Sequence, residues 1–497
     1  MFFSSMNLLF LAFFAGLWSI WRFRSKYGKN GMPMPPGPGG FPVFGSLHML
    51  GRLPHRSLQK LSHKYGPIMS IRLGQVQAIV VSSPEFIEFF FKTHDLVCAN
   101  RLHDTEASKH ISYGQKSLLF SPYTPSVQNT RKLLTVHLLS KSKLEMFKPM
   151  LTQEVENFIH SIQVAAQSQN STVDISARVG SVIEDITFQM LFGFKDDRYN
   201  LKSTIQESLA LSGAVNIADF IPCLGPLDLQ GLRRKMINVK CITDEFLEKM
   251  ISEHERNAKD VQGQHRDFID VILSLRNSTD TQERENIKAN VLDILTGSLD
   301  TTSVIIEWTV SELLRHPRVM KLVQEELKDK VGLHRLVEEE DLDNLKYLKM
   351  VIKESMRLHA PPPFLYRTPM EDLTINGYCI PKNSRIIINI WAMARDPNVW
   401  SDNAEEFYPE RFLETSTEPL GHDFRFLPFG SGRRICPAWL LGSTLVELIV
   451  AQLTHCFNLQ LPNGISPTDL DMSERFGLTS PRVNHLFAVP TYRVLVK

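Results

Sequence analysis

The sequence lacks features that mark several common classes of protein. Its six cysteines are scattered with no CxxC pair, which excludes a disulfide framework and suits a reducing compartment. Basic and acidic residues nearly balance, 55 against 54, so charge gives no reason to expect a nucleic-acid partner. No internal repeat or low-complexity tract is visible, and no linker divides the chain after residue 45. We therefore expect one large domain beyond that point.

Charge is also missing from the first 21 residues, which are mostly Leu, Phe, Met, Ala, Trp and Ile. As a helix this run spans roughly 30 Å, the hydrocarbon thickness of a bilayer. Trp18 and Trp21 stand at its end, and Arg22, Arg24, Lys26 and Lys29 follow. The positive-inside rule places that end in the cytosol. Residues 1–21 thus predict a transmembrane anchor; a cleaved signal peptide is the weaker alternative, since the run lacks a basic start and a small-residue cleavage site.

Residues 22–45 are basic and then rich in proline and glycine, with MPMPPGPGGFP at 32–42. Such a segment is stiff and not helical. It predicts a hinge that holds a cytosolic domain, residues 46–497, close to the membrane; an ordinary interdomain linker has the same composition.

The rest of the chain is mainly helical in its periodicity. Short strands are expected at 68–73 and 78–81, turning at Gly74, and again at 373–375 and 385–388. Between about 84 and 355 the apolar residues recur at helical spacing, and a long apolar helix is expected over about 283–316, ending before Pro317. The fold class predicted is mainly α with a minor β-sheet.

One cysteine has unusual surroundings, in the sequence FGSGRRICPA at residues 429–438. Gly430 and Gly432 permit a tight turn, and an apolar helix is expected from Trp439 to about Cys456. Cys436 then lies just before a helix N-terminus, where free N–H groups and the helix dipole favour thiolate. Arg434 and its neighbour can pair with carboxylates of a bound cofactor. Taken alone, the motif also suits a reactive cysteine or an anion-binding loop.

The spacing FxxGxRxC is more specific, and it resembles the haem-binding signature of the cytochrome P450 superfamily, with Ala438 where the family usually has glycine. The resemblance implies the P450 fold and haem b, with Cys436 thiolate as axial ligand of the iron. It also implies that Phe429, Gly432 and Arg434 belong to the cofactor site. The proline-rich hinge and the segment FGLT at 476–479 are similar to the plant-type class of the endoplasmic reticulum.

Two further motifs strengthen the resemblance. Glu354 and Arg357 are three residues apart on an expected helix, and Arg411 lies in YPERF at 408–412. In the family these three would form a buried structural triad, whereas the simpler interpretation of Glu354 and Arg357 is a surface ion pair of little energy.

The expected long helix contains TGSLDTT at 296–302, an acid beside an alcohol in mid-helix. The resemblance implies that Asp300 and Thr301 relay protons to dioxygen, in a groove that Ser298, in place of the usual glycine, could alter. The alternative is that both side chains only bond backbone groups of the helix.

Substrate contacts follow from the resemblance as well. The family's pocket positions correspond here to apolar stretches that include Phe120, Leu295, Leu299, Phe364 and Leu478. A small hydrophobic substrate, terpenoid or phenolic, is implied. Core packing explains the same residues equally.

One segment departs from the family. Val127 and Gln128 stand where the family usually has Trp-Arg, two residues that hold a haem propionate. Val has no side-chain donor and Gln no charge. Arg131, Arg434 and Arg367 are the remaining candidates, although the stretch before Arg367 is one residue shorter than usual. Either fewer contacts hold the haem or the local backbone differs.

The leading functional hypothesis is a monooxygenase at the endoplasmic reticulum membrane. Electrons would come from NADPH through a membrane-bound flavoprotein reductase, with cytochrome b5 as a further donor. Two alternatives are a haem-thiolate isomerase or dehydratase that does not use dioxygen, and a non-catalytic haem or ligand-binding protein. Asp300 and Thr301 favour the first, because an enzyme without dioxygen needs no proton relay to it.

Overall fold

A computed structural model describes residues 31–102, 104–114, 116–167, 172–195, 201–257, 267–275, 281–413, 417, 420–421 and 423–495. The predicted membrane anchor, residues 1–21, lies outside the described residues, and the predicted hinge is described from residue 31.

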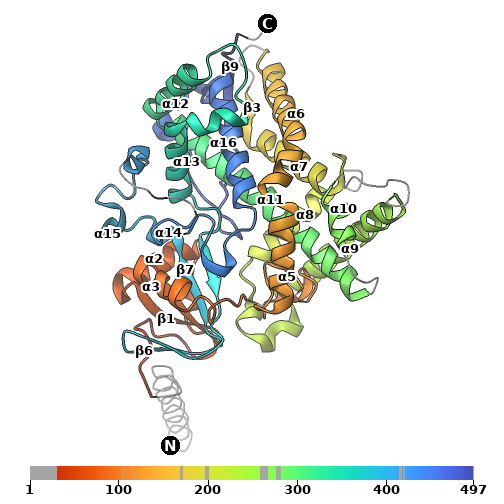
Figure 1. Cartoon of the computed structure of the whole chain (residues 1–497). Helices are drawn as coiled ribbons and strands as arrows, with labels where there is room; N and C mark the ends of the chain where they lie inside the picture. The colour runs from red at the N-terminus through yellow and green to blue at the C-terminus, as the bar shows by residue number, and fades with distance from the viewer. Residues whose placement is uncertain are drawn as a thin grey trace, which may run out of the picture.

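Helices make up most of the molecule, as the periodicity predicted (Figure 1). The longest, α11 (Thr281–Arg315), runs through the centre and ends directly before Pro317, close to its predicted limits. The other α-helices are α2 (Pro54–Tyr65), α3 (Pro84–Glu88), α4 (Glu106–His110), α5 (Pro125–Leu133), α6 (Lys141–Ala166), α7 (Ile175–Phe192), α8 (Leu201–Gly213), α9 (Leu232–Asn257), α10 (Phe268–Ser274), α12 (Pro317–Lys330), α13 (Lys346–Leu358), α14 (Ile390–Met393), α15 (Pro397–Trp400) and α16 (Trp439–Cys456).

The strands form small separate sheets. The largest has four strands in the order β1-β2-β7-β4, with bounds Ile68–Leu73, Val76–Val81, Arg385–Asn389 and Phe364–Arg367. β5 (Leu373–Ile375) pairs with β6 (Tyr378–Ile380), and β3 (Val173–Asp174), β9 (Phe487–Tyr492) and β8 (Phe457–Gln460) form a third sheet. The predicted β1–β2 pair is confirmed, and its turn at Gly74 has φ +60°. Sequence periodicity missed β4, because four residues after a proline run carry no alternation.

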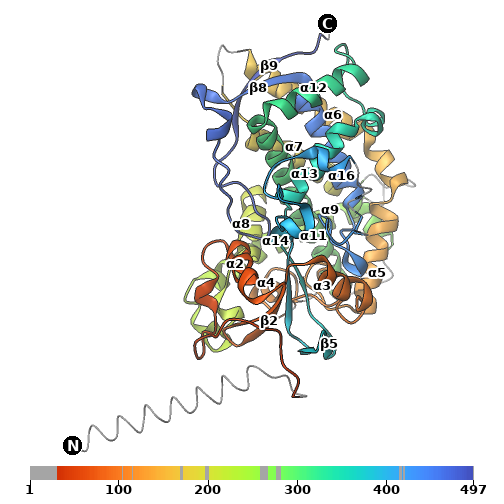
Figure 2. The same cartoon turned by 90° about the vertical axis from the view of Figure 1, so that its left-hand side faces the viewer.

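The two ends of the molecule differ in structure. β1, β2, β5, β6, α2 and α3 lie at one end, and α12, β8 and β9 lie at the opposite end, together with the C-terminus (Figures 1 and 2). The main hydrophobic core lies around α11, which contacts α7, α13 and α16. Of the described helices, α16 alone is long and apolar enough to cross a membrane, but 61% of it is buried inside the protein. Here α16 is a core helix.

The end of the hinge is attached to the sheets. The N–H and the hydroxyl of Ser70 in β1 donate to the carbonyls of Pro36 (2.9 Å) and Pro35 (2.7 Å), and the N–H of Cys379 in β6 donates to Pro33 (2.8 Å). Extended proline-rich backbone has carbonyls without a local partner, and these accept hydrogen bonds from N–H groups of the sheets. The segment from residue 33 therefore packs on the domain, ahead of the predicted boundary at residue 46.

Candidate active site

The loop before α16 is held in a tight turn. Gly430 and Gly432 both have positive φ (+73° and +66°), and a Cβ atom on Gly432 would approach the carbonyl oxygen of Phe91 to 2.9 Å. The N–H of Cys436 donates to the carbonyl of Phe429 at 2.9 Å, which closes the turn. Only glycine permits this backbone without strain. The turn fixes the cysteine relative to the start of α16.

Cys436 lies just before the N-terminus of α16, as the sequence predicted, but burial also acts on the pKa of its thiol. Burial raises the pKa of its thiol, while a backbone hydrogen bond from Ala438 and the charge of Arg131 lower it. The helix N-terminus therefore favours thiolate, as predicted, but desolvation is the larger effect in the protein alone. A metal cation at the sulfur would reverse that balance. Ala438 has φ −98°, an ordinary value for alanine, so the departure from glycine causes no strain here.

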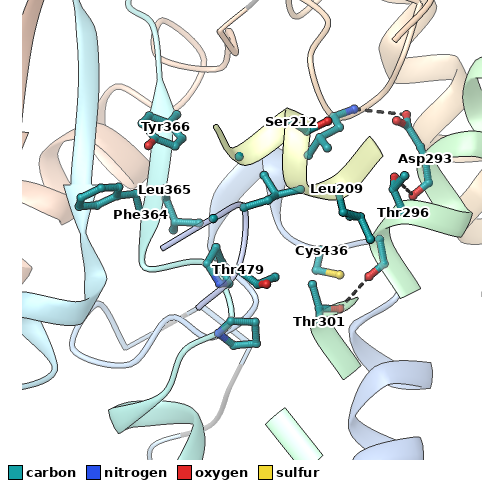
Figure 3. Close-up of a pocket in the computed structure, with 18 of the residues that line it drawn as sticks. Leu209, Ser212, Asp293, Thr296, Thr301, Phe364, Leu365, Tyr366, Cys436 and Thr479 are labelled. Atoms are coloured by element: carbon teal, nitrogen blue, oxygen red, sulfur yellow. Dashed lines mark hydrogen bonds between the residues drawn. The ribbon is translucent and has the colours of Figure 1, made fainter. Parts of the chain in front are cut away.

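A cavity of about 500 Å³ opens above Cys436 (Figure 3). Its wall is mostly apolar and brings together segments far apart in the sequence: Thr301 from α11, Phe364 from β4 and Thr479 from the C-terminal loop all line it. Of the predicted pocket residues, Phe120, Phe364 and Leu478 line the cavity. Leu295 and Leu299 do not: Leu295 is fully buried in the main core and Leu299 packs against it. Both residues lie on a side of α11 that packs into the main hydrophobic core and not on the side that lines the cavity.

Asp293 of α11 connects the helix to the loop that carries Phe120. Its carboxylate accepts from the hydroxyl of Ser117 (2.6 Å) and from the N–H groups of Leu118 (2.5 Å) and Leu119 (3.3 Å). Burial raises the pKa of Asp293 to about 6, and these three hydrogen bonds oppose the rise. The loop is thereby tied to the cavity wall.

The predicted proton-relay residues have different surroundings from one another. Thr301 lines the cavity, and its hydroxyl donates to the carbonyl of Gly297 at 2.7 Å, one helical turn back. The carboxylate of Asp300 does not line the cavity; it accepts a hydrogen bond from the hydroxyl of Thr479. Ser298, where glycine is usual, lines the cavity and accepts from Thr187 of α7 at 3.1 Å. That contact ties α7 to the predicted groove.

Four of the arginines that line the cavity interact electrostatically with one another, and we call them the cavity arginines: Arg101, Arg131, Arg367 and Arg434. Arg434 donates to the carbonyls of Ala99 (2.8 Å), Leu118 (3.1 Å) and Ser121 (2.7 Å), and Arg131 to Ile435 (2.5 Å). Burial and then repulsion from neighbouring arginines together lower the pKa of Arg367 to about 9 and that of Arg434 to about 10. The site carries concentrated positive charge.

Arg101 was not predicted from the sequence. It is half-buried, and its guanidinium donates to the carbonyls of Tyr366 (3.2 Å) and Arg434 (3.5 Å). Desolvation, followed by the charges of the other three arginines, lowers its pKa well below the ordinary value. A lone arginine in a loop carries no periodicity or spacing that would mark it.

The two residues that depart from the family, Val127 and Gln128, both lie on α5. Val127 is buried and Gln128 is exposed. The two departures from the family lie on the same helix as Arg131, about one turn before it, and Arg131 lines the cavity.

Glu354, Arg357 and Arg411 form one buried network, which we call the ionic brace. Glu354 accepts from Arg357 through two hydrogen bonds of 2.8 Å and from Arg411 at 2.9 Å. Arg357 and Glu354 are fully buried and Arg411 nearly so. Arg357 also donates to the carbonyls of Ala394, Ala404 and Glu406. The three predicted residues therefore lie together in a buried triad, and Glu354 and Arg357 do not form a surface ion pair.

Comparison with known proteins identifies the family. The model of the cytochrome P450 family matches residues 35–487. The chain belongs to the cytochrome P450 family. Cytochrome P450 CYP736A12 of Panax ginseng is 50% identical over 94% of this chain and 95% of its own length, and cytochrome P450 71B35 of Arabidopsis thaliana is 38% identical over 92% and 93%. A zebrafish cytochrome P450 solved with abiraterone has a TM-score of 0.74, with 23% identity, over 88% of this chain and all of its own, which supports the fold.

Family membership makes the protein a haem-thiolate oxidoreductase of the monooxygenase class. The residues around the cavity suit such a cofactor, because haem carries two propionates and the cavity arginines form a cationic cluster that lines the same cavity as the cysteine. The cluster would neutralise two carboxylates, and the sulfur of Cys436 is a soft ligand for iron.

Proposed function

We propose that this P450 inserts one oxygen atom from dioxygen into a small hydrophobic plant metabolite, terpenoid or phenolic, in the cavity above Cys436. The observation that carries the proposal is that one apolar cavity contains both the cysteine and the alcohol of Thr301. NADPH would supply electrons through a flavoprotein reductase, with cytochrome b5 as a second donor. Residues 1–21 would anchor the enzyme in the endoplasmic reticulum membrane, with its catalytic domain in the cytosol.

The roles of the chain's own residues follow from their positions. Cys436 ligates the haem iron, and the turn closed by Phe429 and made possible by Gly432 holds that sulfur in place. The cavity arginines pair with the propionates. When bound, the haem activates dioxygen, and thiolate ligation favours cleavage of the O–O bond.

The protein's part in catalysis is to deliver protons and to exclude water. The hydroxyl of Thr301 lies on the cavity wall, where it can pass a proton inward. Asp300 lies behind that wall, and burial raises the pKa of its carboxyl, which favours the protonated form. Asp300 would supply protons and Thr301 would relay them into the cavity.

The apolar wall supports a hydrophobic substrate. Phe120, Phe364 and Leu478 would contact it, and the tie between Asp293 and the loop at 117–119 would keep Phe120 in position. A relative in Azadirachta indica, 38% identical over 98% of this chain, is named melianol synthase. That name supports a biosynthetic role on a specific small molecule.

The carbon-monoxide difference spectrum of the reduced, full-length protein tests the proposal. Wild type should give the strongly red-shifted Soret band of thiolate-ligated haem, and Cys436→Ser should lose it entirely. Cys223→Ser, at an exposed cysteine, is the matched control and should keep the band. A normal thiolate band in Cys436→Ser would refute the assignment.

Turnover with a reductase, NADPH and a panel of terpenoids and phenolics then separates the remaining alternatives. Product that contains oxygen from labelled dioxygen supports the monooxygenase. A normal thiolate band with product but no labelled oxygen would indicate an isomerase or dehydratase, and a band with no product from any member of the panel would favour a binding protein.

A further inference from the structure

The loop that follows η10 (Pro467–Asp469) returns to the centre of the molecule at residues 476–480. Its backbone is fixed there: the N–H of Ser480 donates to the carbonyl of Pro361, and the indole N–H of Trp308 in α11 donates to the carbonyl of Ser480, both at 2.9 Å. Trp308 and Ser480 are buried. Thr479 is therefore held against α11 by its neighbour in the chain.

The hydroxyl of Thr479 has a specific partner. It donates a hydrogen bond to the Oδ2 atom of Asp300, and the side chain is 2% exposed. Burial raises the pKa of the Asp300 carboxyl, whereas the Thr479 hydrogen bond and then the positive charge of Arg475 lower it. Arg475 lies on the same loop and is exposed. One loop thus supplies both the hydrogen-bond donor and the cationic charge that act on this acid.

The same loop forms part of the substrate cavity. Leu478 and Thr479 line it, as Figure 3 shows for Thr479, while the Asp300 carboxylate lies outside the lining. A Cβ atom on Gly213, at the end of α8, would overlap the backbone of Gly477 and Leu478, so α8 and the loop are in direct contact. Thr479 stands between the cavity and the acid.

We infer that Thr479 is a positioning residue for Asp300: its hydroxyl fixes the orientation of the carboxylate, so that the loop contacting the substrate also holds the proton donor. The inference rests on the proposed role of Asp300. For each transfer the Asp300 carboxyl gives one proton toward the cavity and takes one back from solvent on the Arg475 side. Thr479 is not consumed and carries no charge in this cycle.

Coupling of NADPH use to product formation tests the inference in the full-length, haem-loaded enzyme. Thr479→Val keeps the side-chain shape and removes the hydroxyl, and it should lower the product formed per NADPH by about tenfold, the effect of losing a hydrogen bond to a charged group. Thr479→Ser restores the donor and should stay within about twofold of wild type. Thr243→Val, at a buried threonine of α9 whose hydroxyl bonds a helix carbonyl, is the matched control and should not change coupling.

Double variants show whether Thr479 affects coupling through Asp300. Thr479→Val in the Asp300→Asn background should give no further loss, because the group that Thr479 positions has already been removed. Additive losses would overturn the inference. Unchanged coupling in Asp300→Asn alone would overturn the proton role of Asp300 and this inference with it. If Asp300→Asn uncouples and Thr479→Val does not, the inference fails while the proposed function stands.

Infrared spectroscopy supplies a readout that does not depend on turnover. The carboxyl band of Asp300 is identified as the band that Asp300→Asn removes. Thr479→Val should shift this band, and Thr479→Ser should leave it in place, because a carboxyl frequency responds to its hydrogen-bond donor. Thr479→Ala, which avoids a second branched methyl, is measured beside Thr479→Val to cover poor folding. A band unmoved in both variants would overturn the inference.

Discussion

The ionic brace and the cavity arginines both gather guanidinium groups inside the described part of the chain, but the groups that surround these charges differ. In the brace, Arg357 and Arg411 share the carboxylate of Glu354, at distances of 2.8 and 2.9 Å. Among the cavity arginines, Arg434 donates to the backbone carbonyl of Ala99 and Arg367 to that of Ser431. A carbonyl accepts a hydrogen bond but brings no negative charge.

That difference separates a structural role from a binding role. A brace that contains its own anion is complete in the protein alone. Cations gathered at one cavity wall repel one another, which is why Arg101, Arg367 and Arg434 each have a lowered pKa in part through their neighbours. A dianionic ligand would relieve this repulsion. Repulsion among the cavity arginines therefore favours a ligand site, whereas a cluster built around its own carboxylate favours support of the fold.

The largest expected effect comes from removing the anion of the brace. Glu354→Gln leaves Arg357 and Arg411 buried with uncompensated charge, and it should lower the free energy of unfolding by about 3–5 kcal/mol. Chemical denaturation of the haem-loaded protein measures this. Glu410→Gln, which breaks a partly exposed pair with Arg318, is the control and should cost less than about 1 kcal/mol. Equal losses in the two variants would show that the brace is not special.

A cavity arginine should behave in the opposite way. Arg101→Gln should raise the haem dissociation constant about tenfold, because one charge-assisted contact is lost. The unfolding free energy of the haem-free protein should change by less than about 1 kcal/mol, since the substitution also relieves repulsion. Haem transfer to an acceptor protein and denaturation of the haem-free form measure the two quantities. A loss of stability as large as that of Glu354→Gln, with haem affinity unchanged, would place Arg101 in the support of the fold.

The smallest effect is expected at the departure from the family in α5. Gln128 is exposed and one helical turn before Arg131, so Gln128→Arg adds a screened charge beside the cluster. The haem dissociation constant should fall about threefold, in keeping with an exposed ion pair. Haem transfer measures this, with Gln128→Lys as the control for charge alone. A tenfold gain would mean that the four cavity arginines leave the cofactor site incomplete.

Local patterns predicted the elements that have strong signals of their own. The limits of β1 and α16 were predicted correctly, and those of α11 to within a few residues, because apolar periodicity, glycine turns and a following proline act over short stretches of chain. The spacing of Glu354 and Arg357 predicted their pairing for the same reason. The direction of Leu295 and Leu299 was not predictable in this way, since α11 is surrounded by other elements and only their packing decides which side of the helix meets the cavity.

By itself, the sequence determined the fold class, the family and the cysteine loop, since the loop's glycines, arginines and Cys436 are set by spacing within ten residues. Tertiary structure alone decided where Arg101 lies and which residue holds Asp300. Arg101 and Arg434 come from distant segments, and so do Thr479 and Asp300. Contacts between distant segments depend on how the whole chain packs, because the free energy that brings them together comes from the core and not from the residues that meet.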